Sequence, residues 1–308
     1  MRVVVVPASG KTATAAIRSL LDQTSSQDAP PIEIQAVYRN TAKAPPEFTS
    51  KSNIEVLKGD ITDASSLDFT SADAVITLTP SVYDARDIVK YAETVSENVK
   101  AAVERAGTVK HLVLVSSMGA HLSEGVGEIK TCWAAERAFS RTNIPRITFV
   151  RCSYFMENWT MDLSTLKGAE PFFFSTVTPL DYKMPMVAVR DIGRTLANQV
   201  LTREQNSRSP HIFELHGPVN YSPLDVQAAF SKALGRDVAI KPIEKDQLEG
   251  FFSQVFPPAI VGAWVEMTTC FLPGGPALEN LPPEEERGFV RGTVGLDEAI
   301  AEAVRAAQ

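Results

Sequence analysis

The sequence predicts an α/β protein built on a doubly wound parallel sheet, with a smaller α/β region attached. Short apolar runs of strand length recur along the first half of the chain, and amphipathic stretches of helix length separate them. The first apolar run, Val3–Val6, is followed by a short glycine-bearing turn and then directly by a helical pattern. Strands that alternate with helices in this way lie parallel and are joined by right-handed crossovers.

The first half contains signals for six strands and the helices between them. The buried run Val3–Val6 precedes helix Lys11–Asp22, whose apolar residues recur at helical spacing. A short helix capped near Asp63 follows the third strand, and the amphipathic stretch Tyr83–Ala106 follows the fourth. After the fifth strand, Gly125–Thr142 is predicted as a loop and then a helix. The remaining strands are expected at Ile32–Arg39, Ile54–Asp60, Ala72–Pro80, Lys110–Ser117 and Arg146–Ser153.

The second half loses this regular alternation, which predicts a dinucleotide-binding domain at 1–153 and a substrate-capping region at 154–308. The capping region is expected to return intermittently to the first domain. Its predicted elements are a helix over Arg190–Leu201 capped at Asp191, a strand at 211–218, a helix from Ser222, a strand at 238–243 and a helical stretch over Asp246–Phe271.

Composition narrows the class of protein. The chain has 308 residues, of which 44% are hydrophobic and 22% charged, which is typical of a soluble globular protein. A net charge of −7 argues against a nucleic-acid partner. No secretory signal and no apolar run of membrane-spanning length are apparent, so no membrane association is expected. The sequence does not indicate an oligomeric state.

The spacing of the cysteines and histidines indicates the cellular compartment and whether a metal site is expected. Cys132, Cys152 and Cys270 are widely spaced and odd in number, which favours reduced thiols in a cytoplasmic protein and matches no zinc motif. The four histidines form no H-x-x-x-H pair, so no metal site is expected.

The turn after the first strand resembles a dinucleotide loop with one departure. A pattern G-x-x-G-x-x-G would be expected, whereas the chain has Pro7-x-x-Gly10-x-x-Ala13. Gly10 keeps the position that lets backbone approach a pyrophosphate, and Lys11 and Thr12 offer a charge and a hydroxyl to phosphate. Pro7 has a fixed φ and no N–H, so it suits this loop only if the position needs an extended conformation. The alternative is an ordinary turn with no ligand.

The end of the second strand indicates which cofactor would bind. A cofactor with a free 2′-hydroxyl usually meets an acidic residue there, and one with a 2′-phosphate meets an arginine. The strand ends in "VYRN", which places Arg39 at that point with no acid beside it. We therefore expect NADP(H), with a solvated surface arginine as the alternative interpretation of Arg39.

Several strings taken together resemble the NmrA-like branch of the atypical short-chain dehydrogenases/reductases. They are "PASGKTA", "VYRN", "GDITD", "VLVSSMGA", "RCSYFMENW" and "VAVRDIGRTLA", and the resemblance covers nearly the whole chain. "GKTA" and "FMEN" are similar to the festuclavine dehydrogenase group of that branch. The resemblance implies a Rossmann-type domain that binds NADP(H) and a smaller domain that covers the substrate.

The resemblance also implies positions for the cofactor. Gly10, Lys11 and Thr12 would meet the phosphates, and Arg39 the 2′-phosphate. The other implied contacts are Asp60 and Ile61 near the adenine, Thr79 and Pro80 near the ribose, and Ser116, Ser117 and Met118 on the nicotinamide side. Pro7 is the departure that affects the pyrophosphate contact. The family includes reductases, redox sensors and biosynthetic enzymes of secondary metabolism.

The usual catalytic pair of short-chain dehydrogenases is missing. No Tyr-x-x-x-Lys is present, and Glu128 and Cys132 occupy the aligned positions. Lys130, between them, is a candidate to hold the ribose or donate a proton, or else a surface lysine. Glu128 becomes a candidate acid if it is desolvated. Tyr154 is a candidate for catalysis or substrate binding.

The expected substrate contacts are Tyr154 and Asn158, through hydrogen bonds, and Phe155, through its apolar surface. Aromatic residues of the second half, Trp264 among them, would form the pocket wall or else simply belong to the core.

Three functions are consistent with these residues. The favoured one is an NADP(H)-dependent reductase of a small apolar or aromatic molecule in secondary metabolism. The first alternative is a non-redox cyclase, isomerase or dehydratase, in which Glu128, Lys130, His121 or Tyr154 would act as acid or base. The second alternative is a regulator that senses NADP without turnover.

Overall fold

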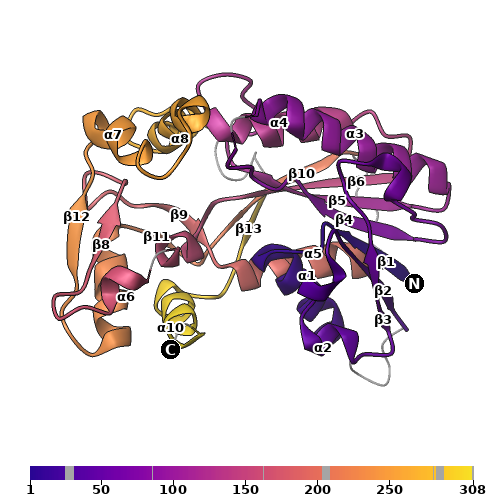
Figure 1. Ribbon diagram of the computed structural model, residues 1–308, viewed down its shortest axis with the longest axis horizontal. Coiled ribbons are helices and arrows are strands. Elements are labelled where there is room, and N and C mark those ends of the chain that lie inside the picture. The colour runs from indigo at the N-terminus through magenta and orange to yellow at the C-terminus, as the bar shows by residue number, and fades with distance from the viewer. Residues whose placement is uncertain are drawn as a thin grey trace.

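The structure, a computed structural model, describes residues 1–24, 31–84, 86–161, 163–202, 209–279, 281 and 288–306. Within these residues, eight strands form one sheet in the order β13-β10-β6-β5-β4-β1-β2-β3, and all their pairings are parallel (Figure 1). The strands are β1 Arg2–Val6, β2 Glu33–Tyr38, β3 Ile54–Lys58, β4 Ala74–Leu78, β5 His111–Ser117, β6 Arg146–Cys152, β10 His211–His216 and β13 Phe289–Arg291.

The strand order defines the fold. From β3 to β6 it is 3-2-1-4-5-6, the order of a doubly wound Rossmann-type sheet, which confirms the predicted fold class. The order reverses between β1 and β4, and ligands of such sheets bind in the crevice at the carboxyl ends of the strands beside that reversal. The loop after β1 is therefore placed where a dinucleotide loop belongs.

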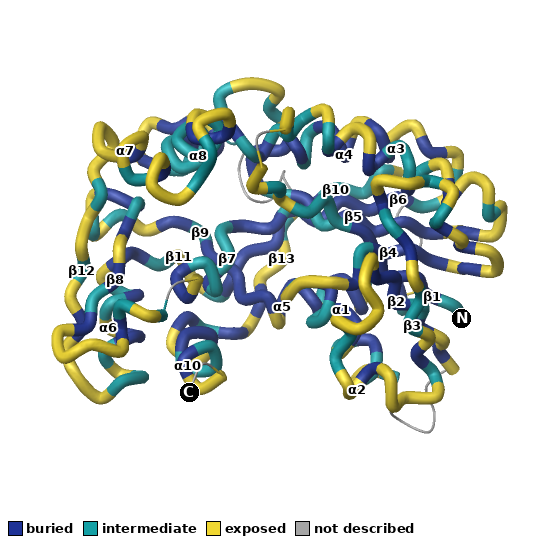
Figure 2. The backbone as a smooth tube through the Cα atoms, viewed as in Figure 1, coloured by how far each residue is buried: buried dark blue, intermediate teal, exposed yellow. Residues whose placement is uncertain are grey.

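Helices cover both faces of the sheet (Figure 1). Helices α3 (Ile88–Ala106) and α4 (Lys130–Phe139) lie on one face, and α1 (Lys11–Gln23) and α5 (Val189–Leu201) lie on the other. Val3 and Val5 pack toward the second pair, whereas Val4 and Val6 pack toward the first. A strand covered on both faces needs apolar residues at every position, which explains the valine run. Figure 2 shows β4 and β5 buried between the helices.

Helix α5 approaches α1 closely because Gly193 has no side chain. A Cβ at Gly193 would lie 2.5 Å from the carbonyl carbon of Ala15, nearer than real contacts allow. The two helices therefore pack backbone against backbone. This packing fixes α1, and with it the turn that precedes α1.

The two small sheets and the helices around them form a second lobe. This lobe has a core of its own, built on aromatic and aliphatic residues such as Trp159, Phe173 and Phe230. Its strands form two small sheets, β11-β9-β7 and β12-β8. The elements are β7 Tyr154–Phe155, β8 Phe172–Ser175, β9 Met184–Val187, β11 Asn220–Tyr221, α6 Pro223–Leu234, β12 Ala239–Pro242, α7 Leu248–Phe252, α8 Pro258–Cys270 and α10 Leu296–Ala306. Strands β10 and β13 return to the large sheet, whereas the boundary at residue 153 stays a prediction.

The remaining elements are short. They are α2 (Pro46–Thr49) and the 3-10 turns η1 Thr41–Lys43, η2 Ala64–Ser66, η3 Gly127–Ile129, η4 Met156–Thr160, η5 Ser164–Leu166 and η6 Lys245–Gln247. Asp63 caps η2, as the sequence predicts, and α6 starts at the predicted place, directly after Ser222, which caps it.

Two predicted helices differ from those observed. The helix expected from Tyr83 begins at Ile88, because the Asp87 carboxylate accepts the backbone amides of Val89 and Lys90 at 3.0 Å and caps the helix there. The helical stretch expected over Asp246–Phe271 is two helices, α7 and α8. Pro257 and Pro258 separate them, since proline fits the start of a helix but not its interior.

The cap of α5 also differs from expectation. Asp191 was predicted to cap this helix, but the residue at the N-cap is Ala188. The Val189 amide instead donates to both carboxylate oxygens of Glu157, at 3.0 Å each. Glu157 lies 32 residues earlier, so this cap depends on tertiary packing.

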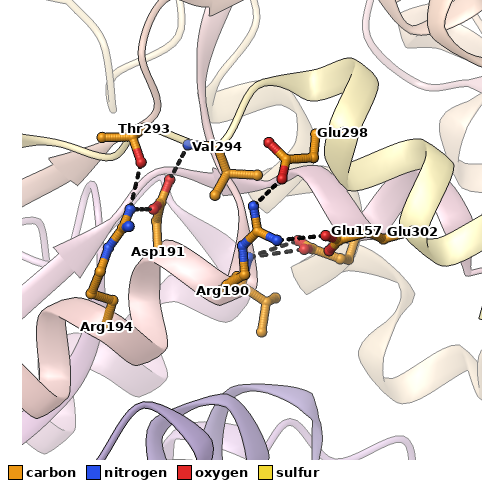
Figure 3. A network of polar contacts seen from close by, with 9 residues as sticks. Glu157, Arg190, Asp191, Arg194, Thr293, Val294, Glu298 and Glu302 are labelled. Carbon is orange, nitrogen blue, oxygen red and sulfur yellow. Dashed lines mark hydrogen bonds and ion pairs between the residues drawn. The ribbon is translucent and has the colours of Figure 1, made fainter. Parts of the chain in front are cut away.

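Asp191 and Arg190 join α5 to the C-terminal segment (Figure 3). Asp191 accepts the Val294 amide at 2.8 Å and an Arg194 N–H. Arg190 donates to Glu302 at 2.5 Å and to Glu298, both on α10. The last helix of the second lobe is therefore fixed to a helix that packs on the large sheet.

Candidate functional site

The turn between β1 and α1 has the form of an anion site. Gly10 is the N-cap of the 13-residue helix α1, with φ +99° and ψ 162°, a conformation that favours glycine. The first amides of a helix have no intrahelical acceptor, and Gly10 has no side chain to accept from them. A Cβ at Gly10 would meet no atom within 4 Å, so the space beside the Gly10 Cα is open. The first turn of α1 contains no acidic residue.

Pro7 is compatible with this turn. Pairing with β2 continues beyond β1 through the Ala8 amide, which donates to the Val37 carbonyl at 2.8 Å. The left-handed φ in the turn belongs to Gly10 and not to position 7. The turn therefore works without the conformational freedom that a glycine would give at position 7.

Arg39 lies directly after β2 and is exposed. Its guanidinium forms no hydrogen bond or ion pair with any residue that the structure describes. It faces Tyr91 of α3: burial raises the pKa of Tyr91, and the positive charges of Arg86 and Arg39 oppose that rise. The Arg86 guanidinium lies 5.0 Å from the centre of the Tyr91 ring. Asp60 also faces Tyr91.

Asp60 and Ile61 follow β3, beside Arg39. The Asp60 carboxylate accepts the Thr62 amide at 2.9 Å and the Thr62 hydroxyl at 2.8 Å, which fixes the local turn. Ile61 is buried, and its carbonyl accepts an N–H from Asn98 at 2.9 Å. The structure thus gathers Arg39, Asp60 and Ile61 at neighbouring strand ends.

The residues expected on the ribose and nicotinamide side lie at the ends of β4 and β5. Thr79 and Pro80 follow β4 and are half-buried. The Ser116 hydroxyl donates to Glu136 at 2.6 Å, and Glu136 is paired with Arg151 inside the protein. The side chain of Ser116 is therefore engaged in the interior. The Ser117 hydroxyl donates to the Met118 carbonyl at 3.0 Å.

Glu128 and Lys130 lie on η3 and at the start of α4, and they differ in their contacts. The Ser81 hydroxyl donates to Glu128 Oε1 at 2.7 Å. Glu128 is half-buried, and burial raises its pKa to about 7, against the lowering effect of the Ser81 hydrogen bond. Lys130 Nζ lies 3.4 Å from Glu266 Oε2 of α8, an oxygen that also accepts the Gly127 amide at 2.9 Å. Lys130 thus joins α4 to α8.

Tyr154 and Asn158 are brought together, as expected of a shared binding site. Burial raises the pKa of Tyr154 above its ordinary range, and a hydrogen bond with Asn158 opposes that rise. The Tyr154 ring lies 5.7 Å from the Trp159 ring. Phe155 packs against the large core between the sheet and helices α1 and α5.

Trp264, expected in the pocket wall or the core, belongs to a group of stacked rings that also includes Tyr83, which was not expected there. Its ring centre lies 5.8 Å from that of Tyr83 and 4.6 Å from that of Phe256. Tyr83 and Ser81 come directly after Pro80, at the end of β4. That position beyond a strand end is the signal that could have identified them, because the carboxyl ends of the strands form the site.

A cavity of about 220 Å³ opens between the two lobes. Met118 of the first lobe lines it together with Tyr182, Lys183 and Asn220 of the second lobe and His216 at the end of β10. Met118 was expected near the nicotinamide from the family resemblance, whereas the other four residues were not expected at a site.

The described ranges offer no candidate for a membrane-spanning helix or a metal cluster. None of the helices there is long and apolar enough to cross a membrane. The same ranges contain no group of three or more His, Cys, Asp or Glu side chains that could hold a metal ion.

The fold is similar to that of several solved structures. Citrobacter sp. triphenylmethane reductase complexed with NADP(H) has 20% sequence identity and a TM-score of 0.71, covering 98% of this chain and 100% of that one. Escherichia coli NADPH-dependent quinone oxidoreductase QOR2 complexed with NADPH has 19% identity and a TM-score of 0.68, with 99% and 100% covered. NmrA, a negative transcriptional regulator, in complex with NADP has 18% identity and a TM-score of 0.69, with 99% and 96% covered.

The sequence comparisons are consistent with these structures at the level of the family. No curated protein matches the chain significantly. The narrower resemblance to the festuclavine dehydrogenases is not confirmed. The model of the NmrA-like family, however, matches residues 1–278. The chain therefore belongs to the NmrA-like family.

Proposed function

We propose that this chain is an NADP(H)-dependent reductase of a small apolar or aromatic molecule. The observation that carries the proposal is the glycine-capped start of α1 at the reversal of strand order, with Arg39, which has no partner among the described residues, at the end of the next strand. Backbone amides at a helix start favour phosphate, and an arginine at that strand end favours a 2′-phosphate. When bound, the reduced nicotinamide would supply a hydride.

The chain's own residues would hold the cofactor along the carboxyl edge of the sheet. The first amides of α1, with Lys11 and Thr12, would bind the pyrophosphate, and Arg39 the 2′-phosphate. Asp60 and Ile61 would lie along the adenine, Thr79 and Pro80 along the ribose, and Ser117 and Met118 along the nicotinamide. Ser116 would contribute its backbone only, because its hydroxyl is bonded to Glu136.

The lobes on either side of this edge offer an apolar setting for a substrate. Tyr83, Phe256 and Trp264 present stacked aromatic rings beside Glu128, and Tyr154 with Asn158 provides polar contacts. Two of the similar structures are of proteins named as reductases or oxidoreductases with NADP(H) or NADPH. A cytoplasmic location and a role in secondary metabolism are the remaining parts of the proposal, and they rest on the family resemblance and the composition.

Fluorescence titration of the purified protein tests the cofactor. NADPH is expected to bind more tightly than NADH, and Arg39→Ala should remove most of that preference, about 1.5–3 kcal/mol for a hydrogen bond to a charged group. Arg141→Ala is the matched control, because Arg141, in the turn after α4, is paired with Glu97 of α3. Equal affinity for the two cofactors in the unmodified protein would contradict the proposal.

Turnover measurements separate the reductase from its rivals. NADPH consumption in proportion to product supports the reductase. NmrA, one of the similar structures, is a transcriptional regulator complexed with NADP. Tight NADPH binding without reduction of any aromatic acceptor would therefore favour a sensing regulator. Product formed at full rate without cofactor would favour the non-redox enzyme.

A further inference from the structure

A carboxyl group and a hydroxyl group from two neighbouring strand ends meet beside the proposed cofactor site. Ser81 follows β4 and Glu128 follows β5, and the Ser81 hydroxyl donates to Glu128 Oε1 at 2.7 Å. β4 is the strand at which the order of the sheet reverses. The carboxyl group therefore lies at the part of the sheet edge where ligands of this fold bind.

Three stacked aromatic rings stand next to this carboxyl group. Tyr83, Phe256 and Trp264, here called the aromatic wall, come from the segment after β4, from the segment before α8 and from α8 itself. The Tyr83 ring is stacked on Phe256 at 5.9 Å and 11° and on Trp264 at 5.8 Å and 23°. Tyr83 is 52% exposed, so a flat aromatic surface remains open to a ligand. Ser81 also bonds to the Tyr83 hydroxyl, which places Glu128 at the base of the wall.

The ionisable groups around Glu128 leave it without a strong counter-charge. They are Tyr83 from the segment after β4, Cys132 on α4, and Lys130, whose ammonium is paired with Glu266 of α8. The pKa of Glu128 is raised to about 7 by burial, with the Ser81 hydrogen bond as the opposing influence. A carboxyl group with this pKa keeps a substantial protonated fraction near neutral pH, and a proton donor needs that fraction.

We propose that Glu128 is the proton donor in the reduction of a planar, neutral, conjugated carbonyl compound such as a quinone, and that Ser81 positions its carboxyl group. The proposal rests on the reductase function above. Reduction of a quinone to a hydroquinone adds one hydride and one proton. The hydride would come from reduced nicotinamide, which becomes oxidised, and the proton from Glu128. The carboxylate that remains would regain its proton from water.

The charge of the electron acceptor determines whether its reduction needs a proton donor such as Glu128. A cationic acceptor, such as a triphenylmethane dye, is neutralised by the hydride alone and takes up no further proton. A neutral quinone becomes an anion unless a proton arrives with the hydride. A buried acid next to an aromatic surface is therefore useful for the neutral acceptor and superfluous for the cationic one.

The test compares menadione, a neutral naphthoquinone, with malachite green, a cationic dye, in the same NADPH assay. Glu128→Gln should lower menadione turnover by about 100-fold, within the range for loss of a general acid, and leave dye turnover nearly unchanged. Ser81→Ala should lower menadione turnover less, and Ser81→Thr should restore it, because threonine keeps the hydroxyl. Glu124→Gln is the matched control, since Glu124 is an exposed glutamate on the loop before η3.

The pH profile separates proton donation from a merely structural role. Menadione turnover should fall as pH rises above about 7, because Glu128 then loses its proton. Glu128→Gln should abolish this fall. Ser81→Ala should move it to higher pH, because the Ser81 hydrogen bond favours the ionised carboxylate. Dye turnover should show no fall in this range.

A measurement without cofactor gives an independent readout. In protein with ¹³C-labelled glutamate carboxyls, NMR should show one group titrating near pH 7, absent in Glu128→Gln and shifted upward in Ser81→Ala. Equal losses with menadione and the dye in Glu128→Gln, or dye turnover without menadione turnover in the unmodified protein, would overturn the proposal. Failure to bind NADPH would instead overturn the reductase function itself.

Discussion

The carboxylate of Asp191 accepts the backbone amide of Val294 at 2.8 Å, although the two residues are 103 positions apart. Asp191 is 1% exposed, and it also bonds to Arg194, which donates to the Thr293 hydroxyl at 2.7 Å. A Cβ at Gly292 would lie 2.2 Å from Asp191 Oδ2, so the segment before α10 can pass this close only with glycine there. The contact fixes the C-terminal segment to α5 (Figure 3).

Replacing Asp191 should therefore destabilise the protein. Asp191→Ala should lower the free energy of unfolding by about 3 kcal/mol, because it leaves the Val294 amide and Arg194 without their buried acceptor. Asp191→Asn should cost less, since it keeps one oxygen acceptor. Chemical denaturation measures both. Lys232→Gln, which removes an exposed ion pair with Asp297, is the control and should change stability by less than about 1 kcal/mol.

Gly193 should tolerate no side chain. Gly193→Ala places a Cβ 2.5 Å from the Ala15 carbonyl carbon, so α5 must move away from α1. The cost should be about 1–3 kcal/mol of unfolding free energy, as for other overpacked sites, and NADPH affinity should fall because α1 carries the phosphate turn. Gly262→Ala in α8 is the control: its Cβ meets nothing within 4 Å, so the helix should gain up to about 1 kcal/mol. Equal stabilities of the two variants would refute the close packing.

Pro7→Gly should preserve cofactor binding. The hydrogen bond from Ala8 to Val37 does not involve position 7, and the left-handed conformation belongs to Gly10. The variant should lose about 0.4–1 kcal/mol of stability, because glycine makes the unfolded chain more flexible. Fluorescence titration and urea unfolding measure the two quantities. A large loss of NADPH affinity in the folded variant would show that the proline ring itself shapes the turn.

The raised pKa of Glu128 also predicts a cost in stability at high pH. The carboxyl has a pKa of about 7 when folded and 4.5 ordinarily, so the unfolded chain releases this proton first as pH rises. Stability should decline between about pH 4.5 and pH 7 on this account. Glu128→Gln should be more stable than the unmodified protein at pH 8 by about 1–3 kcal/mol, and the gap should close by pH 4. A gap that stays constant with pH would contradict this.

His111 should lower the stability of the fold at low pH, whereas Glu128 lowers it at high pH. It is 4% exposed, with its ring bonded to the Thr148 hydroxyl at 2.9 Å, and burial together with Arg146 and His211 lowers its pKa from 6.5 to about 3. Below pH 6.5 the His111 ring is protonated in the unfolded chain but stays neutral in the folded protein. Stability is therefore lost as pH falls toward 3. His111→Gln should therefore unfold less steeply with acid between pH 6.5 and 4, as followed by circular dichroism. An unchanged acid profile would show that other groups control it.

Local patterns in the sequence were enough to predict the large sheet and the turn after its first strand. Strands such as Val3–Val6 and helices such as α1 follow from apolar periodicity and from residues next to them in the chain. The positions of Gly10 at the helix start and of Arg39 after the second strand could be predicted for the same reason, because a strand end followed by a helix start is a local pattern. The cap at Asp63 and the helix start at Ser222 are equally local, and both were predicted correctly.

Contacts between residues far apart in the chain could not be predicted from the sequence, because they depend on tertiary packing. Glu157 caps α5 in place of Asp191, Asp191 is engaged with Val294, and Ser81 meets Glu128 across two strand ends. Each of these partners lies 30 or more residues away, so no local periodicity encodes the pairing. Which strand ends become neighbours depends on sheet order and on helix packing through positions such as Gly193, and both follow from the burial of the whole core.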